Sequence, residues 1–230
     1  MADAAPREVG ATDGEPRTEV VAALRRLDGL GLNRGSTGNL SVRASGADGY
    51  WITPTGMAPE AIGPDDLVRL AADGRTLQGR WAPSSEWPFH GAIYRTRPDL
   101  NAVVHTHSPH ATALACLRRD LPAFHYMVAV AGGDSVPCTP YHLFGTEALS
   151  AAVAVAFERR QACLMANHGL VAAGATLAQA MKVALEIESL CGIYLRALAV
   201  GEPALLSAQE MAEVIERFRT YGQVHPTGSG

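Results

Sequence analysis

Short apolar runs typical of β-strands alternate along this chain with longer segments whose apolar residues recur at helical spacing. The strand-like runs lie between glycine or proline residues, at 40–43, 50–53, 75–78, 102–106 and 162–166. The helical segments lie before, between and after them, at 18–29, 85–97, 146–160, 176–200 and from 207 onward. Because strands and helices interleave without strict strand-helix-strand alternation, the sequence predicts a single α/β domain of three layers, α/β/α, with a central mixed sheet.

The two ends of the chain differ in composition from its centre. Residues 1–17 are small and polar and are interrupted by prolines and glycines, and residues 225–230 are similar. Both segments are therefore expected to be mobile tails. The domain is expected over residues 18–224, with Thr18 as the N-cap of the first helix.

Charge and hydropathy exclude several classes of function. Hydrophobic residues make up 47% of the chain and charged residues 18%, as is typical of a globular protein. The net charge is −4 and no run of lysine or arginine occurs, so no nucleic-acid partner is expected. No uncharged apolar run approaches the ~18 residues of a membrane span, and the cysteine spacing fits neither a metal pair nor a disulfide framework. We therefore expect a cytoplasmic protein with no membrane partner.

A His-x-His motif lies at the end of the apolar run 102–106. Side chains two residues apart on a strand face the same way, with Cα atoms about 6.6 Å apart. The imidazoles of His105 and His107 can therefore bind one metal ion at ~2.0–2.1 Å from each nitrogen. A pair of surface histidines is the alternative interpretation.

A metal site needs a third ligand, and two histidines are candidates. His110 is near in sequence but follows Pro109, whose fixed φ is expected to turn the chain away. His168 follows the buried run 162–166 and precedes Gly169, which permits a close approach of the backbone. The sequence therefore favours His168.

Three short segments of small polar residues can bind an anion without lysine. Ser84 and Ser85 precede a predicted helix, where they can cap the helix or join its free N–H groups in an anion site. The segments 37–39 and 53–56 are either simple turns or further loops of N–H and hydroxyl donors. Glu86 can ligate the metal, act as a base, or simply complement the helix dipole.

Together these motifs resemble the class II aldolase and adducin family, over roughly residues 18–222. The motifs that carry the resemblance follow one another as Thr37-Gly38-Asn39, Thr55-Gly56, Ser84-Ser85-Glu86, His105-x-His107 and His168-Gly169. Within the family, the similarity is to the enzymes that act on L-fuculose 1-phosphate. Asn167 departs from their pattern, since they carry a second histidine before the ligand, and the difference bears on substrate preference.

The resemblance implies a metal centre of one zinc ion per subunit. His105, His107 and His168 would bind the zinc. Glu86 would be a displaceable fourth ligand and the catalytic acid and base.

The resemblance also implies a phosphorylated substrate and a shared site. The substrate phosphate would be held by six residues, Gly38, Asn39, Thr55, Gly56, Ser84 and Ser85. Tyr126 would be catalytic at the aldehyde end, reaching in from a neighbouring subunit, with Phe144, Phe218 and Tyr221 shaping that end. Proteins of this type are similar in forming homotetramers with the active site at the subunit interface.

The residue types agree with metal chemistry. Cleaving a carbon–carbon bond beside a carbonyl requires an enediolate to be stabilised, by a lysine imine or by a Lewis-acid metal. Lys182 is the only lysine of the chain, and its place in a predicted helix indicates a solvated position. Together with the resemblance, which implies the substrate, the prediction is an aldolase that reversibly cleaves L-fuculose 1-phosphate, or a related deoxy-ketose 1-phosphate, to dihydroxyacetone phosphate and an aldehyde such as lactaldehyde. Glu86 would protonate the enediolate.

Other activities share the same fold or motif. A methylthioribulose-1-phosphate dehydratase keeps a glutamate at the Glu86 position, whereas the sugar-phosphate epimerases carry an aspartate there. A metal-free, adducin-like interaction module would lack the three histidines. Metal-dependent amidohydrolases also begin with His-x-His, but they need further ligands late in the chain, where only His225 remains.

Overall fold

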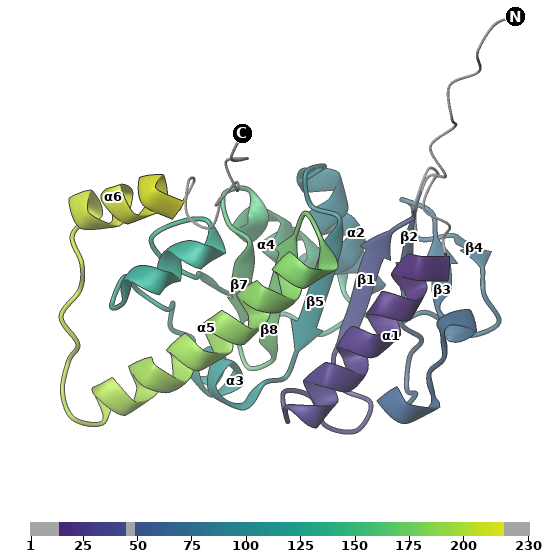
Figure 1. The fold of residues 1–230 in the computed structure, drawn as a ribbon, viewed down its shortest axis with the longest axis horizontal. Coiled ribbons are helices and arrows are strands. Elements are labelled where there is room, and N and C mark those ends of the chain that lie inside the picture. The colour runs from purple at the N-terminus through teal and green to yellow at the C-terminus, as the bar shows by residue number, and fades with distance from the viewer. Residues whose placement is uncertain (1–13, 45–48, 219–230) are drawn as a thin grey trace, which may run out of the picture.

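The structure is a computed structural model that describes residues 14–44 and 49–218 (Figure 1). Tyr221, most of the expected N-terminal tail and the expected C-terminal tail lie outside the described residues. Among the described helices, none combines the length and the hydropathy that crossing a bilayer requires.

The core of the fold is one mixed sheet of eight strands, in the order β4-β3-β2-β1-β5-β8-β7-β6. The strands are β1 (Asn39–Arg43), β2 (Tyr50–Ile52), β3 (Val68–Leu70), β4 (Thr76–Gln78), β5 (Ala102–Thr106), β6 (Cys138–Thr139), β7 (Ala162–Met165) and β8 (Gly169–Gly174). All neighbours are antiparallel except β6 and β7, which are parallel. This arrangement confirms the predicted mixed sheet.

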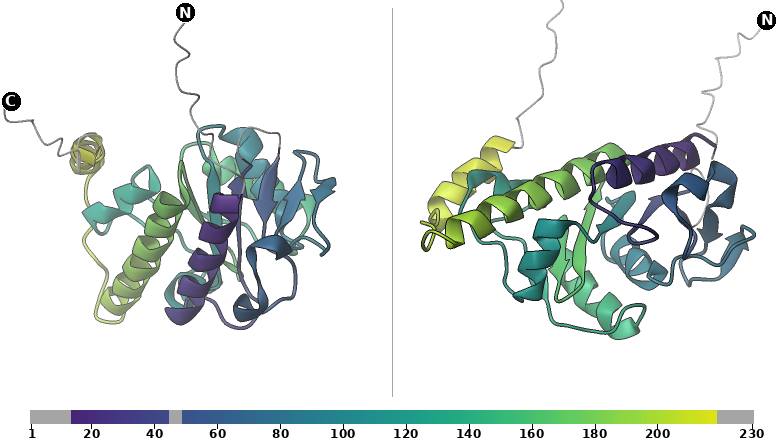
Figure 2. Two further views of the ribbon diagram at one scale, coloured as in Figure 1. Left: turned by 45° about the vertical axis from the view of Figure 1, so that its right-hand side comes forward. Right: turned by 90° about the horizontal axis from the view of Figure 1, so that it is seen from below.

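Helices cover both faces of the sheet. The helices are α1 (Gly14–Gly29), α2 (Trp87–Thr96), α3 (Pro109–Cys116), α4 (Glu147–Phe157), α5 (Leu177–Leu198) and α6 (Ala208–Phe218), with short 3-10 turns η1 (Pro59–Ala61), η2 (Pro64–Asp66) and η3 (Tyr126–Ala131). Helices α1, α3 and α5 pack on one face, and α2 and α4 pack on the other (Figure 2). The predicted three layers are therefore confirmed.

The central strand β5 shows how the sequence separates the two cores. Successive side chains of a strand point to opposite faces. Val104 lies in the core beneath α1 and α5, whereas Val103 lies in the core beneath α2 and α4. His105, the second residue after Val103, therefore faces α2, where its ring meets the edge of Phe89 at 5.6 Å between centroids.

Several elements differ from the sequence prediction. Helix α1 begins at Gly14, so the prediction of Thr18 as its N-cap is wrong, and residues 14–17 are helical rather than part of a tail. Strand β8 was not predicted, because its residues are small and buried on both faces and so lack alternation. Helix α3 was missed because Pro109, taken as a breaker, occupies the first helical turn, where proline is tolerated.

The hairpin between β7 and β8 approaches β5 closely. Asn167 at its tip adopts a left-handed conformation with φ of 54°, which a three-residue turn can require. Gly169 then passes beside β5 so closely that a Cβ atom there would overlap the carbonyl oxygen of Thr106 and lie 3.2 Å from the ring of His107. Glycine at position 169 is therefore a packing requirement.

We predict that Gly169→Ala lowers the free energy of unfolding by about 1–3 kcal/mol, because β8 must move away from β5 to make room for the methyl group. The matched control is Gly29→Ala, where a Cβ meets nothing within 4 Å. That change should shift the stability by less than about 0.5 kcal/mol. Urea unfolding of both variants measures the difference, and equal effects would contradict the close approach.

Candidate active site

Three histidines and one glutamate converge on a single point beside the sheet. One ligand atom each from Glu86, His105, His107 and His168 can be chosen so that all lie within 4.8 Å of one another. The Nε2 atom of His105 lies 3.0 Å from Nε2 of His107 and 3.1 Å from Oε2 of Glu86. The Nε2 atom of His168 lies 3.0 Å from Oε1 of the same carboxylate.

Strand pairing explains why residues far apart in sequence meet here. His105 and His107 lie at the carboxyl end of β5, two residues apart and on the same face. Thr106 of β5 pairs with Leu170 of β8, so the turn that precedes β8 lies beside the end of β5. His168 occupies that turn and points back to the pair.

Helix α2 supplies the carboxylate. Glu86 is the N-cap residue of α2 and is 7% exposed, so its side chain is held close to the sheet and away from solvent. The amide of Asn39 on β1 donates to Oε2 of Glu86 at 2.9 Å. Asn39 is paired with His105 across the β1–β5 ladder, which aligns β1 with the same point.

The donor set fits a divalent metal ion. The Nδ1 atom of His105 lies 2.9 Å from the carbonyl oxygen of Leu170, to which it can only donate, so Nε2 of a neutral ring carries a lone pair. That lone pair faces the Glu86 carboxylate and the ring of His107. The Oε1 atom of Glu86 is buried without a hydrogen-bond partner among the described residues, although His168 is close. A cation among three nitrogens and one oxygen satisfies all of these atoms, in the combination that zinc accepts.

The planes of the three imidazole rings are nearly perpendicular to one another around this point. Each pair of ring centroids is 4.9 Å apart, and the interplanar angles are 70°, 78° and 82°. Since one nitrogen of each ring lies within 4.8 Å of the others, the rings turn nitrogen-bearing edges toward a common centre. Edge nitrogens are the atoms that bind metals.

The electrostatics keep Glu86 and His107 in their metal-binding forms. Burial, with the neighbouring His105 and His168, lowers the pKa of His107 to about 4. Burial raises the pKa of Glu86, but the adjacent imidazoles of His105 and His168 outweigh it, and the net shift is downward. Burial likewise lowers the pKa of His105, and the Glu86 carboxylate more than reverses that effect. The site therefore favours an ionised carboxylate and positive charge near its centre.

A cavity of about 520 Å³ opens beside the four ligands. Its walls include every residue predicted to hold the phosphate: Gly38, Asn39, Thr55, Gly56, Ser84 and Ser85. None of the described residues that line it is a lysine or an arginine. A larger cavity of about 580 Å³ lies between α1 and α5, but it contains none of the predicted ligands.

Backbone hydrogen bonds hold the cavity loops side by side. The N–H of Ser84 donates to the carbonyl of Thr53 at 3.0 Å, and the N–H of Thr55 donates to the carbonyl of Ala82 at 3.1 Å. The turn at Gly38 has φ of 74°, and the adjacent Asn33 amide leaves no room for a side chain there. These contacts fix three separate segments of the chain into one wall.

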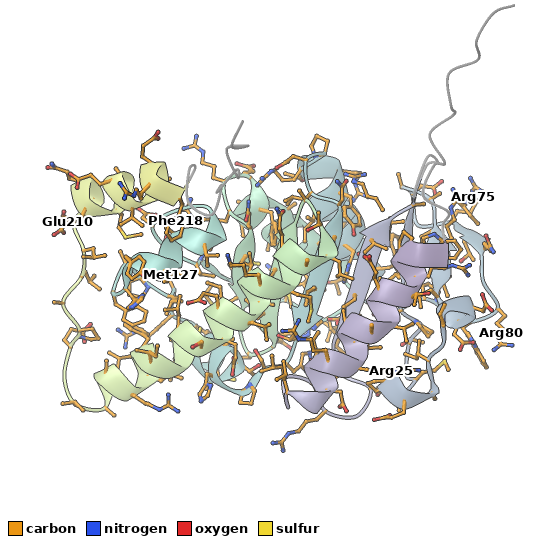
Figure 3. All side chains as sticks on the ribbon, viewed as in Figure 1. Arg25, Arg75, Arg80, Met127, Glu210 and Phe218 are labelled. Carbon is orange, nitrogen blue, oxygen red and sulfur yellow. The ribbon has the colours of Figure 1, made fainter. Side chains whose placement is uncertain are left out.

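The residues expected at the aldehyde end lie in two places. Phe144 lines the cavity. Tyr126 and Phe218 do not; their rings meet each other at 6.4 Å, in η3 and α6, which lie together at one end of the molecule (Figure 3). Tyr126 is 50% exposed, so the prediction that it serves a neighbouring subunit stays a prediction.

The sequence missed some residues of the cavity. Tyr141 and His142 also line it, from the irregular loop before α4. Nothing in their local pattern marks them, because the loop has no periodicity. Asn167, which the sequence linked to substrate preference, lines the cavity as well. His110 lies elsewhere, with Nδ1 at 2.8 Å from Glu188, as expected from its place after Pro109.

Comparison with known proteins gives the same result over most of the chain. Residues 18–195 match the family described as Class II Aldolase and Adducin N-terminal domain. The 5-methylthioribulose-1-phosphate/5-deoxyribulose-1-phosphate aldolase of Rhodospirillum rubrum is 49% identical over 206 residues, covering 90% of this chain and 92% of that protein. The L-fuculose phosphate aldolase of Escherichia coli K12 is 46% identical over 205 residues, covering 89% and 94%.

A solved structure supports the match in three dimensions. It is described as L-fuculose 1-phosphate aldolase and superposes with a TM-score of 0.87 at 38% identity, covering 91% of this chain and 98% of its own. The family resemblance read from the motifs is therefore confirmed. The chain belongs to the class II aldolase and adducin family and is a class II aldolase, a lyase of carbon–carbon bonds.

Proposed function

We propose that this chain is a zinc-dependent aldolase that reversibly cleaves a ketose 1-phosphate to dihydroxyacetone phosphate and an aldehyde. The observation that carries the proposal is the convergence of Glu86, His105, His107 and His168 beside a cavity walled by hydroxyl and glycine-rich loops. His105, His107 and His168 would hold the zinc, with Glu86 as a fourth ligand. When bound, zinc would supply Lewis-acid stabilisation of the negative charge that develops beside the substrate carbonyl.

Glu86 is the residue that carries the proton. Its carboxylate is buried and lies at the centre of the ligand cluster, within reach of a substrate that occupies the cavity. An ionised carboxylate in that position can accept a proton and return it to carbon. Because Asn39 holds Oε2, Oε1 is the oxygen available for this exchange.

The phosphate is bound by directed donors rather than by cationic side chains. Ser84 and Ser85 precede α2 and lie at the positive end of its helix dipole, which favours a bound anion. Thr55, Gly56 and Gly38 add hydroxyl and backbone groups from the facing loops. The same cavity surface would accept a phosphate on C1 of any ketose.

The far end of the substrate is proposed to be apolar, as in a deoxy-ketose or methylthio-ketose phosphate. Tyr141 and Phe144 contribute aromatic rings to the cavity. The names of the two relatives describe enzymes for L-fuculose phosphate and for 5-methylthioribulose and 5-deoxyribulose 1-phosphates. These sugars share the phosphate end and differ in the group at the other end.

The central test is a coupled assay for dihydroxyacetone phosphate across L-fuculose, 5-deoxyribulose and 5-methylthioribulose 1-phosphates, with the unphosphorylated ketoses as controls. We expect cleavage of the phosphorylated sugars only. Chelation should lower the rate at least about 100-fold, and added zinc should restore it. Full activity without metal, or loss of water in place of carbon–carbon cleavage, would contradict the proposal.

Glu86→Gln should keep the fold and still bind zinc through the three histidines, with lower affinity, but with zinc in excess it should lose about 10²- to 10⁴-fold in kcat, because the amide cannot carry the proton. Glu60→Gln is the control, since Glu60 is exposed on η1. Steady-state kinetics with metal analysis measure both. Turnover of Glu86→Gln near that of the unmodified protein would remove the acid–base role.

We further propose that the protein is a homotetramer in which Tyr126 of one copy completes the site of the next. Tyr126→Phe should then lower kcat about 100-fold. Mixed tetramers of Tyr126→Phe and Glu86→Gln copies should regain activity, because about one quarter of their sites combine two intact residues. A monomeric native mass, or mixtures no more active than their components, would refute this arrangement.

A further inference from the structure

A buried chain of polar side chains leads away from the active site between α2 and β1. The Nδ2 atom of Asn39 lies 2.9 Å from Oε2 of Glu86, and its Oδ1 lies 2.6 Å from Nε2 of His90. On the other side of that ring, Nδ1 of His90 lies 2.7 Å from Oγ of Ser41. Ser41 Oγ in turn lies 2.8 Å from the hydroxyl of Tyr94. All five residues are at most 7% exposed.

The spacing of these residues follows from the two elements that carry them. Glu86, His90 and Tyr94 are four residues apart, so they lie along one face at the start of α2 and within it. Asn39 and Ser41 are two residues apart and lie on the same face of β1. This face of α2 packs against this face of β1. Polar side chains from the helix and the strand alternate along one line of hydrogen bonds.

The hydrogen bonds of this line have only one consistent direction. The Glu86 carboxylate is an acceptor, so Asn39 must turn its NH₂ group toward it and its carbonyl oxygen toward His90. The Nε2 atom of His90 must then carry the hydrogen, which leaves a lone pair on Nδ1 of the neutral ring. Ser41 donates to that lone pair and accepts from Tyr94. Starting from Glu86, each hydrogen bond in the line thus determines which atom donates in the next one.

His90 contacts the Asn39 amide on the side opposite Glu86, and it favours the same amide orientation as the carboxylate does. The two ends of an amide side chain have the same shape, so packing alone does not choose between them. An N–H group of the His90 ring beside Oδ1 favours one amide orientation. In the reversed orientation, the NH₂ group of Asn39 would face that N–H, and the amide oxygen would face the Glu86 carboxylate. Burial lowers the pKa of His90 to about 3, which agrees with a neutral ring.

We propose that His90 is a positioning residue, which acts through Asn39 to hold the Glu86 carboxylate in the orientation that faces the metal ligands. The inference rests on the proposed role of Glu86. It assigns to His90 no contact with the substrate, since His90 does not line the cavity. It also gives a function to a histidine that its sequence neighbourhood indicates only as a structural group.

The first test is made on the unmodified, zinc-loaded protein by nitrogen-detected NMR of its histidines. The chain of hydrogen bonds requires the hydrogen of His90 on Nε2, with Nδ1 as an acceptor. A hydrogen on Nδ1 would mean that His90 donates to Ser41 and does not donate to Asn39, and this result would overturn the proposal. This measurement needs no variant and no turnover.

The second test compares three variants. His90→Phe keeps the ring volume but removes the hydrogen bonds to Asn39 and Ser41, and it should lower both kcat and zinc affinity about 10- to 100-fold. The KM for the ketose phosphate should change less than about twofold, because the phosphate loops are untouched. His90→Gln restores a donor near the position of Nε2 and should recover most of the loss.

Tyr94→Phe is the matched control for burial and stability. It removes the hydrogen bond at the far end of the same line, so it should destabilise the fold while leaving kcat and zinc affinity within about twofold. If Tyr94→Phe lost as much activity and zinc as His90→Phe, or a folded His90→Phe lost neither, the positioning role would be wrong.

Zinc affinity is measured by competition with a chromogenic chelator, so it is independent of the substrate. If zinc affinity and the NMR result agree with expectation but no ketose phosphate is cleaved, the proposed function fails and the positioning of Glu86 stands. If cleavage is normal in the unmodified protein and His90→Phe binds zinc equally well, the positioning role alone fails.

Discussion

The antiparallel pairing of β5 with β8 is the constraint on which the active site depends. The pairing fixes where the turn before β8 lies, and that turn carries His168, the candidate metal ligand farthest in sequence from the His-x-His motif. A shift of one residue in this register would send His168 to the opposite side of the sheet edge. Gly169 holds the register because the backbone of β5 occupies the space that any larger residue would need.

Around that constraint, the charges are arranged so that the site is negative at the ligands and neutral in the cavity. The Glu86 carboxylate is the only acidic group among the described residues that line the cavity, and no lysine or arginine accompanies it there. A cation held by the cluster would therefore bring positive charge to a cavity wall that has no permanently cationic side chain. Burial and the neighbouring histidines favour the neutral form of His107, which is the form that can bind such a cation.

The site residues that the sequence predicts are those that occur in short motifs with a regular spacing. His105 and His107 are two residues apart at the end of a strand, and Ser84 and Ser85 precede a helix, so spacing alone indicates their faces. His90 could not be assigned in this way, because its partners are on β1, some 50 positions earlier. A lone histidine on the buried face of a helix looks the same whether it fills space or orients an amide.

The fold, like the site, was predicted only where local sequence patterns determine it. Three layers follow from the order of helical and strand-like segments, but the order of the strands does not, because it depends on which edges pair after collapse. Strand β8 shows this limit, since its run of glycine, alanine, leucine and valine has no alternation and becomes a central strand only through burial on both faces.

The absence of lysine and arginine from the described cavity wall has a consequence for how the cavity would recognise a phosphate. Hydroxyl and N–H donors act over one hydrogen-bond length and depend on direction, whereas a lysine or arginine attracts any anion over a distance that salt shortens. A phosphate proposed to bind at this wall would therefore be selected less by its charge than by its tetrahedral shape, which lets its oxygens meet donors from several loops at once.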